Sequence, residues 1–469
     1  MPAGVTRKLL DTVVANGFCI GCGACSAVAG SPLTIKLNDD GQYEAAARAD
    51  VDADDLAEFE QVCPFSETAR DEDEIGRALY QDCAGHNPNT GYFRSLYAGH
   101  VVEGDYRTRG SSGGFGTWIA AELIREKRVD FVIHVSDRFS EPCESGSASA
   151  LFGYRISATI EGVSGGAKSR YYPVHMADVL RTVRERPGRY AIVGLPCFIK
   201  AVRLLQQSEP IFAERIRFCI GLVCGHLKSA MFADSLAWQS GFAPGTLRSI
   251  DFRSKDPGAA ADHYRVCMSN GSKQVNLPAR DFFGSDWGAG AFKYKACDFC
   301  DDVFAETADV VVGDAWLPEF VGDPLGNNIV LVRNAELDQL ISEAAKQSRI
   351  AITPLTVAEI AASQAGGLRH RRDAISYRLA KEKQAQRWVP QKRVKPALAI
   401  FPKNERQRQD LRAEFRSASA KAFREARSSG DYDLYVKQMM PIYEKYRAIG
   451  GSFIQRVASL LRRTARHIP

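Results

Sequence analysis

The chain has 469 residues, of which 45% are hydrophobic and 25% are charged, and its net charge at pH 7 is +5. This composition is ordinary for a globular protein with a sizeable core, and so mild a charge does not by itself indicate a nucleic-acid partner. The sequence lacks the ~18-residue apolar run of a membrane-spanning helix and the apolar start of a signal peptide. We therefore expect a cytoplasmic protein whose cysteines are metal ligands rather than disulfides.

Three cysteines near the N-terminus follow the spacing C-x2-C-x2-C: Cys19, Cys22 and Cys25. This is most of a bacterial ferredoxin signature, whose fourth cysteine comes three residues later and directly before a proline. Ala29 occupies that position, and the next Cys-Pro pair is formed by Cys63 and Pro64. We predict that Cys63 completes a 4Fe-4S site in a ferredoxin-like module over residues 1–80. A structural zinc site and chance spacing are the alternatives.

Strand-like and helix-like runs alternate from about residue 81 to residue 360. Strands are predicted over 95–102, 129–136, 189–195, 216–224 and 308–316, and helices over 114–127, 175–186 and 198–207. Such alternation is typical of an α/β fold, so we predict a core with a mostly parallel sheet. Residues 361–469 are rich in Arg and Lys, and we expect them to form a basic helical C-terminal extension.

A glycine- and serine-rich loop precedes the first predicted helix of the core, and it contains Ser111, Ser112, Gly113 and Gly114. Serines at the N-cap and glycines without side chains would expose amide groups at the positive end of the helix, which suits a phosphate. Arg107 and Arg109 could add charge-assisted contacts. An ordinary capped turn would explain the same residues.

A second cysteine set lies at predicted strand ends and in one CxxC pair: Cys197, Cys224, Cys297 and Cys300. Ligands of open α/β sheets bind at the carboxyl ends of the strands. Four thiolates brought there from separate segments could hold a second 4Fe-4S cluster. Buried free thiols and a redox-active CxxC remain the alternatives.

Four motifs occur in an order that resembles a known family: SSGGFGTWIAAELIREKRVDFVIHV, AIVGLPCFIKAVRLL, FCIGLVCGH and CDFCDDVFAETADVVVGDAW. The family is that of the coenzyme F420 (deazaflavin) hydrogenase and dehydrogenase beta subunits. It also includes 7-hydroxymethyl chlorophyll a reductase and bacterial proteins associated with polysaccharide gene clusters. The resemblance covers roughly residues 15–335. It implies a flavin-binding core with FAD near the glycine-rich loop, 4Fe-4S clusters, and electron transfer between a ferredoxin-like donor and an organic acceptor.

The resemblance also implies roles for individual residues. Ser111, Ser112, Gly113 and Gly114 correspond to the flavin-phosphate loop, and Cys197, Cys224, Cys297 and Cys300 to the ligands of the core cluster. Gly313 and Asp314 match a Gly-Asp pair that ends a strand facing the cofactor. Lys168 and Ser169 lie where the family tends to have Gly-Ser-Lys-Tyr, although this match is imperfect.

The leading interpretation is therefore an FAD- and iron-sulfur-dependent oxidoreductase with two clusters, a small organic substrate and a link to polysaccharide biosynthesis. Its partner would be a ferredoxin-like donor or a redox partner subunit. No catalytic side chain is predicted. The alternative is a non-catalytic electron-transfer subunit or adaptor of a larger redox complex. A zinc-stabilised nucleic-acid binder is disfavoured because no aromatic-interleaved basic motif accompanies the charge.

The last residues predict a basic amphipathic helix. Its apolar face would carry Phe453, Ile454, Val457, Leu460 and Leu461. Such a helix can adsorb to an anionic membrane surface or dock on protein. Docking is favoured, because most amphipathic helices of globular chains face a core.

Overall fold

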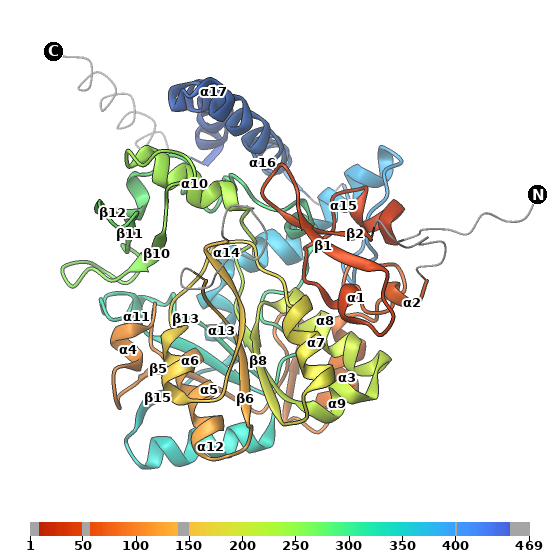
Figure 1. Cartoon of the computed structure of the whole chain (residues 1–469), viewed down its shortest axis with the longest axis vertical. Coiled ribbons are helices and arrows are strands. Elements are labelled where there is room, and N and C mark those ends of the chain that lie inside the picture. Colours follow the sequence, from red (N-terminus) through yellow and green to blue (C-terminus); the bar gives the residue numbers. More distant parts are fainter. Residues whose placement is uncertain (1–8, 49–56, 139–149, 399–400, 451–469) are drawn as a thin grey trace, which may run out of the picture.

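The structure is a computed structural model, and it describes residues 9–48, 57–138, 150–398 and 401–450. At its centre is an eight-stranded mixed sheet with the strand order β15-β5-β14-β13-β9-β8-β6-β7 (Figure 1). The four middle strands run parallel to one another: β6 (Phe131–Asp137), β8 (Tyr190–Gly194), β9 (Ile216–Leu222) and β13 (Val310–Asp314). The outer strands pair in antiparallel fashion: β7 (Phe152–Ser157), β14 (Asn328–Val332), β5 (Ser95–Val101) and β15 (Ile350–Pro354).

The prediction of a mostly parallel sheet is therefore wrong for the sheet as a whole, although it holds for the middle strands. All five predicted strands are present, and four of them are the parallel ones. The missed strands are β7, β14 and β15. β14 is a run of five buried residues, and periodicity cannot distinguish so short an apolar run from part of a buried helix.

Helices cover both faces of the sheet. α5 (Phe115–Arg125) and α12 (Ala335–Lys346) pack on one face, and α7 (Ala177–Glu185) and α8 (Pro196–Ser208) pack on the other. Successive residues of a strand point to opposite faces, and the two cores divide accordingly. Val132, Ala191 and Val310 belong to the core under α5, whereas Ile133, Ile192 and Val311 belong to the core under α7 and α8.

The N-terminal region packs against the second of these cores. It contains an antiparallel hairpin, formed by β1 (Leu33–Leu37) and β2 (Tyr43–Ala47), with the Asp-Gly pair in its turn. Its helices are η1 (Leu10–Val14), α1 (Ala24–Ala27), α2 (Ala57–Glu60) and α3 (Glu72–Tyr80). Phe18, Ile20 and Ala45 join the same buried cluster as α7 and α8. The boundary at residue 80 stays a prediction.

The C-terminal region is helical, as predicted. It consists of α13 (Val357–Ser363), α14 (Ala365–Leu368), η4 (Arg369–Asp373), α15 (Ile375–Gln384), α16 (Lys403–Ser429) and α17 (Tyr432–Gly450). α16 and α17 lie at the end of the molecule opposite α12 (Figure 1). The rings of Phe423 and Tyr435 lie 5.4 and 5.5 Å from the ring of Phe292. The amphipathic helix predicted around Phe453 to Leu461 lies outside the described residues.

The remaining elements are short. A separate antiparallel sheet consists of β10 (Ser249–Ser254), β11 (Arg265–Ser269) and β12 (Gln274–Pro278), and β3 (Gly85–Asn87) pairs with β4 (Gly91–Phe93). The other helices are α4 (Tyr106–Arg109), α6 (Ile160–Gly165), α9 (Pro210–Arg215), α10 (Ala230–Gln239), α11 (Pro318–Val321), η2 (Ala279–Asp281) and η3 (Lys295–Phe299). Among the helices of the described ranges, none combines the length and the apolar character needed to cross a bilayer.

Candidate functional site

A cavity of about 660 Å³ opens at the carboxyl ends of the parallel strands. Leu195 follows β8, Cys224 follows β9 and Asp314 ends β13, and all three residues line the cavity. This edge is where open α/β sheets bind their ligands, and the volume is in the range of pockets that enclose cofactors and other small molecules.

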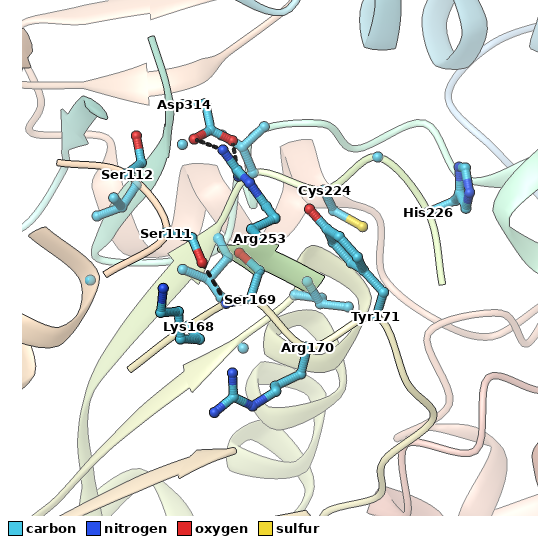
Figure 2. A pocket seen from close by; sticks show the side chains of 18 of the residues that line it. Ser111, Ser112, Lys168, Ser169, Arg170, Tyr171, Cys224, His226, Arg253 and Asp314 are labelled. Atoms are coloured by element: carbon cyan, nitrogen blue, oxygen red, sulfur yellow. Dashed lines mark hydrogen bonds and ion pairs between the residues drawn. The ribbon is translucent and has the colours of Figure 1, made fainter. Parts of the chain in front are cut away.

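The glycine- and serine-rich loop forms one end of the cavity. Ser111, Ser112 and Gly114 line it, together with Gly116 in the first turn of α5 (Figure 2). The N-cap of α5 is Gly114, at φ 92°, which has no side chain to cap the helix; the amide of Phe115 donates instead to Asn328 Oδ1 at 3.2 Å. The expectation that the serines cap this helix is therefore wrong, because the chain reaches the helix through a left-handed glycine.

The serine hydroxyls bind neighbouring segments instead. Ser111 Oγ accepts a hydrogen bond from the amide of Ser169 at 2.9 Å, and Ser112 Oγ donates to the carbonyl of Asn327 at 2.8 Å. Gly113, which was expected to bind phosphate, is not one of the described residues that line the cavity. A Cβ on Gly113 would lie 2.7 Å from the carbonyl oxygen of Gly99. This glycine thus allows the loop to pack against β5.

The segment from Lys168 to Tyr172 forms the adjacent wall and brings positive charge to the cavity. Lys168 has φ 111°, an unusual conformation for a residue with a side chain, and its Nζ lies 3.0 Å from Asp251 Oδ2. Arg170 stands 4.9 Å over the ring of Phe152, and its Nη2 lies 3.4 Å from Asp137 Oδ1. Its buried Nε lacks a hydrogen-bond partner among the described residues. These cations favour an anionic ligand.

Arg107 and Arg109, which the sequence favoured as phosphate contacts, lie elsewhere. Arg107 pairs with Asp323 and Arg109 with Asp105, and neither arginine lines the cavity. Gly313 and Asp314 do line it, and their contact with a cofactor stays a prediction. The carboxylate of Asp314 pairs with Arg253 of β10 (Figure 2), which the sequence reasoning missed.

The other end of the cavity combines cations with an indole ring. The ring of Trp287 lies 4.2 Å from that of His226 and 4.6 Å from that of Tyr171. Lys228 is 1% exposed, donates to the carbonyl of Ala291 at 2.6 Å and has no carboxylate partner in the described part of the chain. Burial lowers its pKa to about 7, and the charge of the nearby Lys293 contributes. A buried ammonium in such surroundings would be stabilised by an anion.

The first cysteine set comes together around α1. Burial raises the pKa of the Cys25 thiol well above its ordinary value, and the charges of Cys22, Cys19 and Cys63 raise it further. All four thiols therefore lie within electrostatic range of one another. The glycine spacers are necessary: Gly21 has φ 63°, and a Cβ on it would lie 2.4 Å from the Tyr43 carbonyl oxygen. Ala29, by contrast, is exposed.

The second cysteine set also comes together, from three separate segments. Burial raises the pKa of Cys197 well above its ordinary value, and the charges of Cys300, Cys224 and Cys297 add to this, followed by that of Cys22. The two sets are thus neighbours, since Cys22 belongs to the first. Cys224, a member of the second set, lines the cavity (Figure 2).

Within the described ranges, no three His, Cys, Asp or Glu side chains converge closely enough to hold one metal ion. A four-iron cluster is larger than an ion, so the sulfurs that bind it stand further apart.

Two sequence models describe most of this core. The coenzyme F420 hydrogenase/dehydrogenase beta subunit N-terminal domain matches residues 96–181, and the C-terminal domain of the same subunit matches residues 188–358. Together they cover more than half of the chain. The chain belongs to the coenzyme F420 hydrogenase/dehydrogenase beta-subunit family.

Individual relatives are distant. The coenzyme F420-dependent sulfite reductase of Methanocaldococcus jannaschii is 22% identical over 351 residues, which are 71% of this chain but 46% of that protein. The chain thus spans about half the length of this curated relative. A solved chain of the F420-reducing [NiFe] hydrogenase complex of Methanosarcina barkeri is 15% identical, with a TM-score of 0.49 over 65% of this chain and 98% of that one.

In this member of the family, residues beyond the matched regions complete the site. His370, Arg371 and Arg412 line the cavity, and all follow residue 358, where the family match ends. Arg371 also donates hydrogen bonds to the sulfurs of Cys300 and Cys224. No sequence signal distinguished these residues from a solvated basic run, because only the fold brings them to the cysteines.

Proposed function

We propose that this chain is an iron–sulfur flavoprotein oxidoreductase subunit, with two 4Fe-4S clusters and FAD, that transfers electrons between a redox partner and a small organic molecule. The observation that carries the proposal is the order of the sites in space. The first cysteine set adjoins the second through Cys22 and Cys197, and Cys224 of the second set lines the cavity. Clusters bound by the two cysteine sets would form an electron-transfer path that ends at a cofactor bound in the cavity.

The donor chemistry of both sets fits iron–sulfur clusters. Thiolates are the soft ligands of such clusters, and amide groups already point at the sulfurs. The amide nitrogen of Ala45 lies 3.3 Å from Cys19 Sγ, and that of Leu227 lies 3.2 Å from Cys297 Sγ. We assign one cluster to Cys19, Cys22, Cys25 and Cys63, and the other to Cys197, Cys224, Cys297 and Cys300.

The cavity fits a flat cofactor with phosphate groups. The amides at the start of α5 and the cations of Lys168 and Arg170 would hold the phosphates, while Tyr171 and Trp287 provide apolar walls that exclude water. A flavin exchanges electrons in pairs and a 4Fe-4S cluster exchanges them singly, so the two together connect both kinds of electron transfer.

A deazaflavin coenzyme is the second candidate for the same cavity. The family description and both relatives name coenzyme F420, which also carries phosphate and a flat ring system. FAD remains our first assignment because the glycine- and serine-rich loop, Lys168 and Arg170 at one end of the cavity offer donors for phosphate groups, as the resemblance implies for FAD.

The organic substrate would occupy the end of the cavity near Trp287. Lys228 and Arg412 bring positive charge there, and neither has a carboxylate partner among the residues that the structure describes. The indole ring offers a flat apolar surface between them. These features favour a planar, anionic substrate. The link to polysaccharide biosynthesis is not part of the proposal.

Electrons would enter at the first cysteine set. Cys19 and Cys63 are partly exposed, whereas Cys22 and Cys25 are buried, so the edge of this set is accessible to a ferredoxin-like donor or a partner subunit. The relative from Methanocaldococcus jannaschii is more than twice as long as its matched part. A chain without flavin would instead be the non-catalytic electron-transfer subunit.

Anaerobic purification followed by iron and sulfide analysis tests the clusters. We expect about eight irons per chain, and about four in either the Cys22→Ser or the Cys297→Ser variant, because each loses one 4Fe-4S cluster. Cys267→Ser, in β11 and outside both sets, is the matched control and should keep the wild-type content. Unchanged iron in Cys22→Ser or Cys297→Ser would refute the corresponding site.

Mass spectrometry of the cofactor released from the same preparation tests the cavity. We expect FAD in a one-to-one ratio with the chain, and loss of that FAD when Lys168 and Arg170 are both changed to Met. If a deazaflavin is released instead, the cofactor of the cavity is the deazaflavin and not FAD. A chain that holds both clusters and no flat cofactor, even after incubation with either compound, would support the electron-transfer subunit.

A further inference from the structure

Arg371 lies in the C-terminal region, yet its guanidinium contacts two cysteines of the second set. Nη1 lies 3.1 Å from Cys300 Sγ, and Nη2 lies 3.5 Å from Cys224 Sγ. The same two nitrogens donate to the carbonyl oxygens of Asp302 and Gly225, each at 2.6 Å. The side chain is 2% exposed. Its planar fork is therefore fixed between the CxxC segment and the end of β9.

Among the residues that the structure describes, no carboxylate pairs with the charge of Arg371. Over the described residues, its polar contacts are the two sulfurs and the two carbonyl oxygens. The neighbouring Arg372 differs, because its Nη2 lies 2.5 Å from Glu306 Oε1. A buried guanidinium without an anion is costly. Thiolates that bind a cluster carry the negative charge that would balance it.

We propose that Arg371 sets the reduction potential of the second cluster, an inference that rests on the proposed function. Reduction adds negative charge at this site, and a fixed cation with two donors on the sulfurs stabilises that charge. Arg371 thereby raises the potential and favours electron flow from the first set towards the cavity. Arg371 follows residue 358, where the family match ends. The C-terminal region therefore takes part in electron transfer.

A redox titration of the full-length protein, followed by electron paramagnetic resonance, tests this role. The signal of the second cluster is identified as the one that Cys22→Ser retains. In Arg371→Met we expect the midpoint of this signal to fall by about 59 mV or more, which is a tenfold change in a one-electron equilibrium constant. Arg371→Lys keeps the charge but not the planar fork, so its midpoint should lie between those of the wild type and Arg371→Met.

Arg369→Met is the matched control, because Arg369 is exposed on the same turn, η4. Its midpoint should equal that of the wild type. An unchanged midpoint in Arg371→Met, with iron content intact, would overturn the proposal. If Arg371→Met loses the cluster, Arg371→Lys decides: a lowered midpoint supports the proposal and a wild-type midpoint refutes it. Loss of the cluster from both variants would assign Arg371 a purely structural role and also overturn it.

Iron analysis of the wild type separates this inference from the proposed function. A wild-type chain without the second cluster refutes the proposed function itself. A wild-type chain with both clusters, whose second midpoint does not respond to Arg371, refutes the tuning role alone.

Discussion

Arg253 and Asp314 form a bidentate ion pair at the wall of the cavity. Arg253 Nη1 lies 2.7 Å from Asp314 Oδ2, and Nη2 lies 3.0 Å from Oδ1 (Figure 2). Arg253 comes from β10 and Asp314 ends β13, so the pair connects the small antiparallel sheet to the central sheet. The side chains are 6% and 20% exposed, which makes the pair a largely buried one.

Asp314→Asn should destabilise the protein by about 3 kcal/mol, because it leaves the Arg253 charge buried without an anion. Urea unfolding would show this as a lower midpoint with an unchanged slope. The additional change Arg253→Met should restore part of the loss, since it removes the unpaired charge. Asp256→Asn is the control, because Asp256 pairs with Arg265 at 3.4 Å in a partly exposed position and should cost about 1 kcal/mol or less. An equal effect of both variants would contradict this view of the pair.

Gly113 should tolerate no side chain, although it lies outside the cavity. In Gly113→Ala the new methyl group would meet the Gly99 carbonyl and the Asn328 amide, 2.7 and 2.8 Å away. We expect a loss of about 1–3 kcal/mol from overpacking. Gly116→Ala is the matched control, because its methyl would meet Leu222 at 3.8 Å. Thermal unfolding should leave the Gly116 variant at least as stable as the wild type, and equal stability of the Gly113 variant would refute the packing role.

Arg393 should be essential for stability, because it joins all three predicted units of the chain. It pairs with Asp73 of the N-terminal region at 2.7 Å and with Glu306 of the core at 2.8 Å, and its side chain is 7% exposed. Arg393→Met should cost about 3 kcal/mol, since it removes one of the cations that balance the buried carboxylates of Glu306 and Asp301, although Arg372 still pairs with Glu306. Arg387→Met removes an exposed pair with Glu382 and should cost at most about 1 kcal/mol. Urea unfolding that leaves Arg393→Met as stable as Arg387→Met would contradict the prediction.

The sequence predicted what depends on local spacing. The Cys-Pro pair grouped Cys63 with the first set, and the end of a predicted strand grouped Cys197 with the second. The structure brings the thiols of each set near one another, and their role as ligands stays a prediction. The same reasoning misjudged the serines at 111 and 112, since a hydroxyl near a helix start is equally able to bind a neighbouring loop. Here Ser111 meets the amide of Ser169, a long-range contact.

The basic C-terminal run was the least predictable part. Arg371 and Arg393 resemble solvated residues in the sequence, because a charged run usually forms an exposed face. In the structure they are buried against sulfurs and carboxylates contributed by distant segments. Nothing in the spacing of the run identifies which arginine meets which partner, because that depends on how the terminal helices pack on the core.

Lys255 should make cofactor binding depend on pH near neutrality. Its Nζ donates to the carbonyl oxygen of Ser112 at 2.9 Å, just behind the loop that would bind phosphate. Burial lowers its pKa to about 7, the cations of Lys168, Arg107 and Arg253 lower it further, and Asp323 acts in the opposite direction. Without ligand, the folded state therefore binds fewer protons than the unfolded state above about pH 7, so the free energy of unfolding rises with pH there.

The pH dependence of cofactor affinity has the opposite sign to that of the free energy of unfolding, because an anion in the cavity favours the charged form of Lys255. The phosphates of FAD would favour the charged form of Lys255 and raise its pKa, so affinity should be highest below about pH 7 and should fall as pH rises through the range in which free Lys255 loses its proton. Calorimetric titration of cofactor-depleted protein with FAD, in buffers of different ionisation enthalpy, should show proton uptake at about pH 7. Lys255→Met should abolish this uptake and bind FAD as the wild type does at about pH 9. If Lys255→Met still takes up a proton, the proton binds to another group. If the wild type takes up no proton, the phosphates do not bind at this end of the cavity.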